Sequence, residues 1–295
     1  MRFSESRLAT LDCGPQARRQ IHIWEPSAGL APRAVIMALH GGMAHAGDYV
    51  TPALYFRERG IATVSYDMCG HEKQRRVDIP GFQVFLDEGR LFLQWVRREY
   101  PGVPVFVMGH SMGALIATHL GLGYFADDAE ISGFIMSSPY YVNAIKVSPV
   151  LLALSGVLGA LAPRMKVPLA PLTDQLTHDA AITARHYADE KDDIRATEIT
   201  VRFGNALQGA QAGLAERMRS WRHPLYAVIA GDDKLADARA SEAMLRSIDA
   251  SLLTLRIQPH NYHENFNEVS REQIFADILG WMEARMLLAP AAATA

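Results

Sequence analysis

Six short, almost purely apolar runs recur along the chain, and each one ends in glycine or polar residues. Continuous apolar character is typical of strands in a parallel sheet that helices cover on both faces. Segments 82–98 and 270–286 carry apolar residues at helical spacing. Strands that alternate with helices predict a doubly wound α/β fold, with ligands bound beyond the carboxyl ends of the strands. The six runs are 34–39, 61–66, 103–108, 131–136, 225–230 and 252–257.

The alternation stops between Pro139 and His223. No strand-like run stands out there: the first part is strongly apolar with several prolines, and the second is polar with a mostly helical pattern. We therefore expect a core formed by 1–138 and 223–288, with a helical cap, or lid, inserted at 139–222. A further edge strand is expected at 18–25, which ends before Pro26. The alanine-rich tail 289–295 is expected to be disordered.

Composition excludes several classes of protein. The 295 residues carry a net charge of −3, so no basic domain points to nucleic acid. The two cysteines, Cys13 and Cys69, are too few for a disulfide framework and favour a reducing compartment. We see no apolar signal segment at the start and no apolar stretch of spanning length. We expect a cytoplasmic protein without a bound metal.

One junction between an apolar run and a helical segment carries the pattern G-x-S-x-G. The residues are Gly109-His110-Ser111-Met112-Gly113. This pattern places a serine on a sharp turn with strained backbone angles, where small neighbours prevent collisions. We predict that Ser111 is a nucleophile. The alternative is a plain tight turn whose serine caps the following helix.

A serine hydroxyl needs a base, and the base needs a partner that fixes its tautomer. Two histidines lie in the loop after the sixth run, and we favour His263 over His260, which stands directly after Pro259. The sequence His263-Glu264-Asn265-Phe266-Asn267 is not a zinc motif, because its last residue is asparagine.

Three aspartates follow the fifth run. Asp233 is the favoured acid, since it stands at the turn where a carboxylate can accept the second ring N–H of the histidine. Asp232 is the alternative, and Asp237 is expected to cap a helix that begins near Ala238.

Acyl transfer also needs N–H donors for the negatively charged oxygen that forms during the reaction. One is the N–H of Met112, directly after the serine. The other is expected in the glycine loop His40-Gly41-Gly42, where we assign the N–H of Gly42. The alternative for this loop is a plain turn.

Taken together, these pieces resemble the monoglyceride lipase and lysophospholipase group of α/β-hydrolases, over about residues 18–285. The resemblance implies an α/β-hydrolase fold in which Ser111, Asp233 and His263 form the triad and Gly42 and Met112 supply the oxyanion donors. It implies a small lipid ester as substrate and no cofactor. Besides the motifs above, it rests on His45 and Tyr49, Ser137-Ser138-Pro139, Gly231-Asp232-Asp233-Lys234, His263-Glu264 with Asn267-Glu268, Leu161-Ala162-Pro163-Arg164, Thr177-His178-Asp179 and Tyr187-Ala188-Asp189.

The chain departs from that group in three places. Met43-Ala44 precede His45, so the group's usual glutamate is absent. Residues 70–74 read Gly-His-Glu-Lys-Gln where the group has Gly-His-Gly-x-Ser, and Ala114 stands where a glycine is common. None of these positions belongs to the triad, so they bear on the substrate rather than on the reaction.

A dense, uncharged apolar pattern opens the predicted cap. It includes Val147, Leu151, Leu154 and Leu158. These residue types fit a buried helix of the cap, and they equally fit a lid whose apolar face meets lipid or lines an acyl tunnel. The resemblance favours the lid, transient contact with membranes and monoacylglycerol-like esters.

Two other functions are weighed against this prediction. The same triad would serve a small-substrate carboxylesterase, lactonase, thioesterase or C–C hydrolase. A non-catalytic binding protein of the same fold is disfavoured by the complete Ser–Asp–His set.

Overall fold

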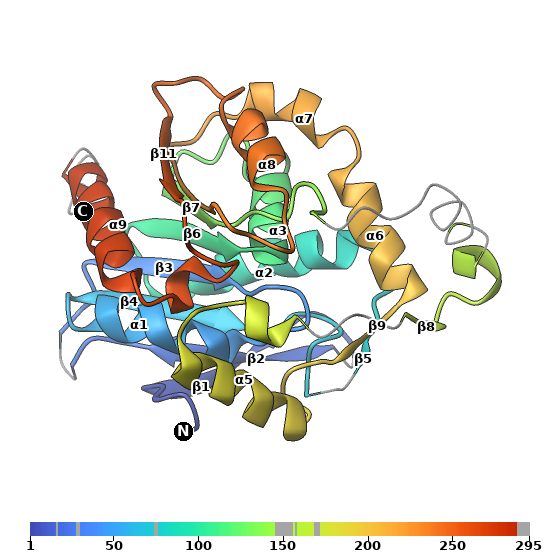
Figure 1. Cartoon of the computed structure of the whole chain (residues 1–295). Coiled ribbons are helices and arrows are strands. Elements are labelled where there is room, and N and C mark those ends of the chain that lie inside the picture. Colours follow the sequence, from blue (N-terminus) through green and yellow to red (C-terminus); the bar gives the residue numbers. More distant parts are fainter. Residues whose placement is uncertain are drawn as a thin grey trace.

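An eight-stranded sheet forms the centre of the molecule in the computed structural model (Figure 1). The structure describes residues 1–15, 17–27, 30–73, 76–144, 156, 158–167 and 172–287. The strand order is β1-β2-β4-β3-β6-β7-β10-β11. The strands are β1 (Arg7–Asp12), β2 (Arg18–Trp24), β3 (Ala34–Leu39), β4 (Ile61–Tyr66), β6 (Val105–His110), β7 (Ile131–Ser137), β10 (Leu225–Ala230) and β11 (Leu253–Gln258).

The six predicted strands are confirmed as β3, β4, β6, β7, β10 and β11, and all of their pairings with one another are parallel. β2 confirms a strand near 18–25, but the expectation that it lies at the sheet edge was wrong. It pairs antiparallel with β4 on one side and with the unpredicted strand β1 on the other, and β1 is the edge strand. Successive residues of β3 belong to two different apolar clusters, because side chains alternate between the two faces of the sheet. This double burial explains the continuous apolar runs.

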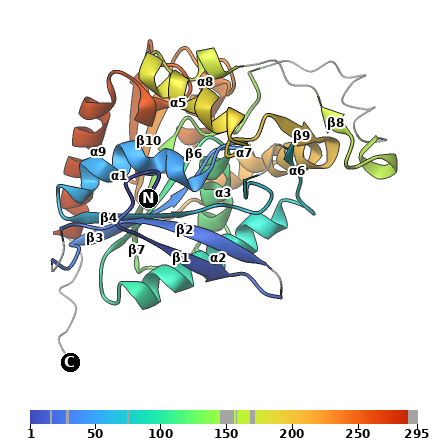
Figure 2. The same ribbon diagram turned by 90° about the horizontal axis from the view of Figure 1, so that it is seen from below.

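Helices cover both faces of the sheet (Figure 2). α1 (Val50–Arg57) and α9 (Arg271–Met286) contribute to one apolar cluster, and α2 (Gln83–Glu99), α3 (Met112–Gly121) and α8 (Ala238–Leu245) contribute to the other. The predicted helices 82–98 and 270–286 correspond to α2 and α9. The arrangement is the α/β-hydrolase fold predicted from the sequence.

Residues 139–222 contain helices, as expected, but also two short strands. The helical elements in the described part of this segment include η2 (Thr173–Gln175), α5 (Ala180–Lys191), α6 (Val201–Gln211), α7 (Leu214–Arg217) and η3 (Met218–Ser220). β8 (Lys166–Val167) and β9 (Glu198–Thr200) join β5 (Arg76–Val77) in a three-stranded sheet, which no strand-like run in the sequence had indicated. These strands are too short for a periodic pattern to reveal them.

Several predicted features fall outside the described residues. They are Val147, Leu151 and Leu154 of the expected lid and the expected disordered tail at 289–295. Leu158 is described and is half-buried. The boundaries of the cap at 139 and 222 stay a prediction.

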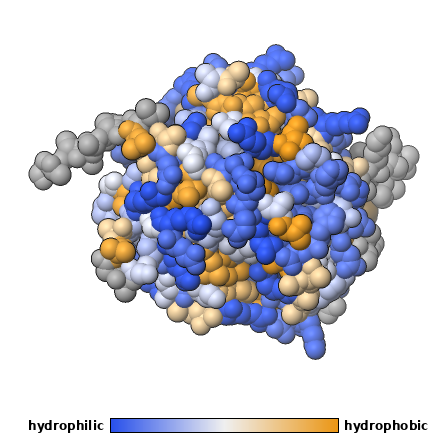
Figure 3. Space-filling model, turned by 60° about the vertical axis from the view of Figure 1, so that its left-hand side comes forward, coloured by the Kyte–Doolittle hydropathy of each residue, from blue (hydrophilic) through white to orange (hydrophobic). Residues whose placement is uncertain are grey.

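On the molecular face drawn in Figure 3, apolar side chains form separate groups among polar and charged ones. In the described part of the chain, no helix combines the length and apolar character that crossing a bilayer requires.

Candidate active site

The predicted site residues follow the carboxyl ends of four strands. His40, Gly41 and Gly42 come after β3, and Ser111 comes directly after β6. Asp233 follows β10 and His263 follows β11. In a parallel sheet these loops share one edge, which is where such folds bind ligands.

Ser111 stands on a strained turn between β6 and α3. Its backbone angles are φ 54° and ψ −118°, and its side chain does not cap α3. A Cβ atom at Gly109 would lie 2.6 Å from the backbone N of Ala114, and one at Gly113 would lie 1.9 Å from the carbonyl oxygen of Leu39. Both positions therefore require glycine. The helix-cap alternative for Ser111 does not fit this geometry.

Asp233 and His263 form a hydrogen-bonded pair. Nδ1 of His263 lies 2.7 Å from Oδ2 of Asp233. The other carboxylate oxygen, Oδ1, accepts the backbone N–H groups of Leu235 at 2.8 Å and Ala236 at 3.0 Å. Burial alone would raise the pKa of Asp233, but the neighbouring His263 and the two N–H groups outweigh it, so the pKa lies below its ordinary value. An ionised Asp233 keeps the proton of His263 on Nδ1.

The rival candidates lie elsewhere. The side chain of Asp232 is 48% exposed and pairs with Lys234. Asp237 caps α8, as expected, by accepting the N–H of Ala240 at 2.9 Å. His260 is exposed. The structure therefore brings together Asp233 and His263 from the two sets of alternatives.

The imidazole of His263 packs against the serine turn. Its ring centroid lies 4.9 Å from that of His110, the residue before Ser111. Nε2 of His263 is buried and has no hydrogen-bond partner in the described part of the chain, so it does not bond the hydroxyl of Ser111 here. Such bonds are often loose before substrate binds. Burial, with the neighbouring His263, lowers the pKa of His110 to about 4, so His110 adds no charge beside the base at neutral pH.

The glycine loop after β3 lies against the same turn. A Cβ atom at Gly41 would lie 3.5 Å from Cβ of Ser111, and one at Gly42 would lie 3.6 Å from Sδ of Met112. The side chain of Phe203, from α6, also reaches Gly42, with its Cζ 3.8 Å from that Cβ position. The two predicted oxyanion donors therefore come from adjacent backbone segments, and α6 closes one side of them.

Two buried histidines hold the glycine loop. Nδ1 of His40 donates to the carbonyl of Gly41 at 2.8 Å, and its Nε2 accepts the N–H of Met68 at 3.1 Å. Nε2 of His71 accepts the N–H of Met43, whose φ is 64°, at 3.1 Å. Burial lowers the pKa of His40 to about 4 and, with the nearby His40, that of His71 to about 3. Both rings are therefore neutral at pH 7, as these acceptor roles require.

Sequence patterns assigned no role to His71, Phe203 or Arg195. His71 stood out only as part of the altered 70–74 segment, and Phe203 and Arg195 carried no local signal. Their contacts join segments that are distant in the chain, which motif spacing does not reveal.

One cluster in the described part of the chain has donor atoms that could hold a metal, namely His45, Asp48 and Asp189. Arg195 donates to Asp48 at 2.7 Å, and Arg2 donates to Asp189 at 2.7 Å. The arginines already compensate both carboxylates, so the cluster is better described as a salt-bridge network than as a cation site.

Comparison with known proteins identifies the family. Residues 31–270 match the family described as serine aminopeptidase, S33. A monoacylglycerol lipase from Mycolicibacterium smegmatis is 28% identical over 267 residues, which cover 90% of this chain and 92% of that protein. Phospholipase YtpA from Bacillus subtilis is 30% identical over 247 residues, which cover 83% of this chain and 93% of that protein.

Solved structures show the same fold. A soluble variant of monoglyceride lipase from Saccharomyces cerevisiae, in complex with a substrate analog, has a TM-score of 0.77 at 19% identity over 95% of each chain. Monoacylglycerol lipase from Paleococcus ferrophilus has a TM-score of 0.74 at 17% identity over 90% of this chain and 98% of that one. The chain therefore belongs to the serine aminopeptidase S33 family and to the monoglyceride lipase and lysophospholipase group of α/β-hydrolases.

Proposed function

We propose that this serine ester hydrolase cleaves monoacylglycerols or similar esters of long acyl chains, through an acyl-enzyme on Ser111. The observation that carries the proposal is the Asp233–His263 pair packed against the strained serine turn. Because Nδ1 of His263 is engaged by Asp233, the ring atom that remains to accept a proton is the unpartnered Nε2.

The reaction proceeds in two halves. Oγ of Ser111 attacks the ester carbonyl carbon while Nε2 of His263 takes its proton, and Asp233 stabilises the resulting imidazolium. The N–H groups of Gly42 and Met112 donate to the carbonyl oxygen as it becomes negative. His263 then protonates the leaving alcohol. Finally, a water molecule that is deprotonated by His263 attacks the acyl-enzyme and releases the fatty acid and Ser111.

The relatives and the cap support the lipid substrate. The monoacylglycerol lipase and the phospholipase both match along most of their lengths. A lid at 139–222 would bring an apolar wall to the site, and Phe203 already lies beside Gly42. Near Leu158, the exposed apolar side chains of Leu161, at 79%, and Met165, at 42%, support transient contact of the lid with a lipid surface.

A cytoplasmic location is also proposed. Cys13 and Cys69 are both free thiols, which is typical of proteins in a reducing compartment. Burial raises their pKa to about 12 and about 11, respectively, so both stay protonated and unreactive at neutral pH.

The test is fatty-acid release from a series of 1-monoacylglycerols with increasing chain length. We expect a preference for medium or long chains. Ser111→Ala is expected to lower kcat by at least about 10³-fold, because the residual catalysis comes only from binding and the oxyanion donors. Ser220→Ala, on η3, serves as the matched serine control and is expected to keep wild-type turnover.

Other results would change the assignment. Turnover confined to the shortest chains would make the protein a small-ester hydrolase with the same triad. Equal turnover of wild type and Ser111→Ala would overturn the nucleophile. Failure of the wild type both to hydrolyse esters and to react with a fluorophosphonate would favour a non-catalytic binding protein.

A further inference from the structure

A buried arginine connects the two loops that carry the proposed site. NH1 of Arg195 donates to Oδ2 of Asp48 at 2.7 Å, and NH2 donates to Oε1 of Glu264 at 3.1 Å. Asp48 lies in η1 (Ala46–Tyr49), shortly after Gly42, and Glu264 directly follows His263. All three side chains are largely buried, with Arg195 only 7% exposed. One guanidinium therefore spans from the glycine loop to the histidine loop.

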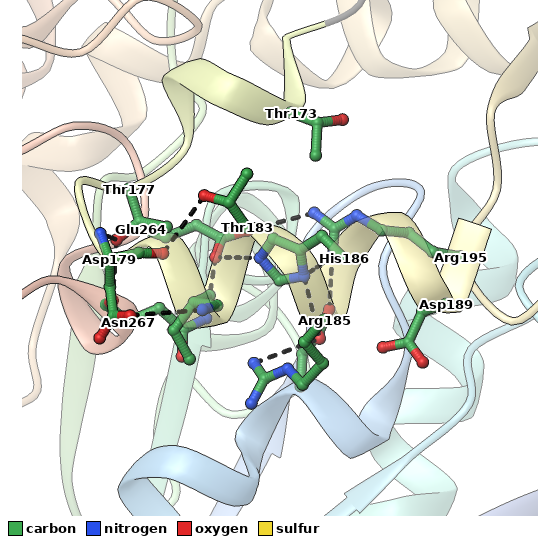
Figure 4. Close-up of polar contacts among 12 residues, drawn as sticks. Thr173, Thr177, Asp179, Thr183, Arg185, His186, Asp189, Arg195, Glu264 and Asn267 are labelled. Carbon is green, nitrogen blue, oxygen red and sulfur yellow. Dashed lines mark hydrogen bonds and ion pairs between the residues drawn. The ribbon is translucent and has the colours of Figure 1, made fainter. Parts of the chain in front are cut away.

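Both carboxylate oxygens and the backbone N–H of Glu264 make hydrogen bonds. Its Oε2 accepts from Nε2 of His186 and from Nδ2 of Asn267, both at 2.8 Å. Its backbone N–H donates to the carbonyl of Leu176 at 2.8 Å. Figure 4 shows Glu264, His186 and Arg195 directed toward one another beside α5. The residue after His263 is thus fixed by both its side chain and its backbone.

The charges of this cluster are balanced by arginine. Nε2 of His186 lies 2.8 Å from the Glu264 carboxylate, and Nδ1 of the same ring lies 3.3 Å from NH1 of Arg195. The guanidinium of Arg195 can only donate hydrogen bonds. Arg195 places a permanent positive charge between Asp48 and Glu264. NH2 of Arg185 lies 3.8 Å from the other carboxylate oxygen of Asp48, Oδ1.

Both carboxylates stay ionised in spite of their burial. Burial alone would raise the pKa of Asp48, but the nearby side chains of His45, Arg195, His186 and Arg185 lower it below its ordinary value. The pKa of Glu264 lies well below its ordinary value, because His186 and Arg195 outweigh the effect of burial. Each carboxylate is therefore a full charge that its arginine partner must compensate.

The backbone beside Arg195 reinforces the connection. The N–H of Ala196 donates to the carbonyl of Met43 at 2.9 Å. Met43 directly follows Gly42, and its own N–H is held by His71. Residues 176–196 thus contact the glycine loop and the histidine loop at once, through both backbone and side chains.

We propose that Arg195 and Glu264 are positioning residues, which hold the glycine loop of Gly42 and the loop of His263 at the separation that acyl transfer needs. The proposal rests on the serine hydrolase function proposed above. Neither residue touches the reacting atoms. It follows that residues 176–196 belong to the fixed scaffold of the site, although they lie inside the predicted lid segment.

The test compares Arg195→Met, Glu264→Gln and the double variant. Arg195→Met leaves the buried carboxylates of Asp48 and Glu264 without their arginine, and Glu264→Gln leaves Arg195 paired with Asp48 alone. We therefore expect a lower Tm in both single variants, with the larger fall in Arg195→Met. We also expect kcat to fall by at least about 10-fold with KM within about threefold, since misplacement affects the transition state more than binding. In the double variant Glu264 no longer carries a charge, and only Asp48 lacks its arginine partner. Its Tm should therefore lie above that of Arg195→Met, whereas its kcat should stay low.

A matched control separates the effect of losing a salt bridge on stability from its effect on the position of the site loops. Arg271 donates to Asp179 at 2.6 Å and so joins the same cap segment to the chain after His263, without reaching the glycine loop. Arg271→Met is expected to keep kcat within about twofold of wild type. The rate at which a fluorophosphonate labels Ser111 should fall in parallel with kcat in the Arg195 and Glu264 variants.

Two results would overturn the proposal. One is a double variant that regains wild-type kcat together with its Tm, and the other is a loss that lies entirely in KM. A wild-type protein that neither hydrolyses esters nor reacts with the fluorophosphonate would overturn the proposed function and this inference together, so the two failures are distinguishable.

Discussion

At the scale of single residues, the two oxygens of Asp233 have different tasks. Oδ2 binds Nδ1 of His263, while Oδ1 is fixed by the N–H groups of Leu235 and Ala236. The backbone N–H groups therefore orient the carboxylate of Asp233 toward His263. Asp232, one residue earlier, points to Lys234 and is half-exposed.

Asp233→Asn is expected to lower kcat by about 10³–10⁴-fold, because an amide nitrogen can donate to Nδ1 of His263 and hold the wrong tautomer. Asp232→Asn is the matched control, since it makes the same chemical change one residue away and should keep kcat within about twofold. Steady-state hydrolysis of one monoacylglycerol by both variants measures the difference. A large loss in Asp232→Asn, or none in Asp233→Asn, would show that the acid is misassigned.

The sequence favoured Asp233 as the acid and left Asp232 as the alternative. Both aspartates stand at the turn after β10, and the direction of a turn side chain depends on distant partners. The serine was easier to find, because Gly109 and Gly113 are dictated by local collisions with Ala114 and Leu39. A motif forced by backbone sterics is readable from sequence, whereas a choice made by a tertiary contact is not.

At the scale of elements, α5 begins at a well-defined cap. Oδ1 of Asp179 accepts the N–H groups of Ala181 at 3.0 Å and Ile182 at 3.3 Å. Its Oδ2 accepts from Arg271 at 2.6 Å. One side chain therefore both starts the helix that carries His186 and ties it to the start of α9.

Asp179→Ala removes the cap and the ion pair, and we expect the free energy of unfolding to fall by about 1 to 2 kcal/mol. Asp179→Asn keeps an oxygen that can cap the helix, so it should lose clearly less. Urea denaturation of the two variants and the wild type provides the comparison. Equal losses in both variants would mean that the ion pair with Arg271, rather than the cap, stabilises this end of α5.

The strands show which elements a sequence reveals. Those of the parallel sheet were predicted to within two residues, because five of the six are buried almost throughout. β11, at the sheet edge, is only partly buried but keeps an apolar start. β1 was missed, since it lies at the sheet edge and alternates between covered and exposed positions, with Leu8 44% exposed. β5, β8 and β9 have only two or three residues each, and they exist because distant segments meet.

At the scale of the whole molecule, the site depends on contacts between distant segments. Arg195 is 147 residues from Asp48 and 69 residues from Glu264. The triad candidates could be found because each follows a recognisable strand, and the fold brings strand ends together. The network behind them could not be found, because arginine and glutamate are ordinary surface residues until the fold buries them.

Three buried, neutral histidines also make the whole fold sensitive to acid. Burial holds the pKa of His40 at about 4, of His71 at about 3 and of His110 at about 4. In the unfolded chain an imidazole titrates near pH ~6.5. Between these values the unfolded state binds protons that the folded state does not, so this contribution to stability is complete above pH ~6.5 and is lost as the pH falls toward ~4.

We expect Tm to be nearly constant from pH ~8 to ~7 and to fall steeply between pH ~6.5 and ~4.5. From the difference between the folded and unfolded pKa, His40 and His110 each contribute on the order of 3 kcal/mol to this loss, and His71 contributes somewhat more. His22 opposes the trend: burial alone would lower its pKa, but Asp67 and Glu5 raise it above the ordinary value. Calorimetry at pH ~5.5 in two buffers of different ionisation enthalpy should show net proton uptake on unfolding. A constant Tm down to pH ~5 without proton uptake would mean that these rings are protonated in the folded protein, which would remove the acceptor atoms that His40 and His71 offer to the loops beside the proposed site.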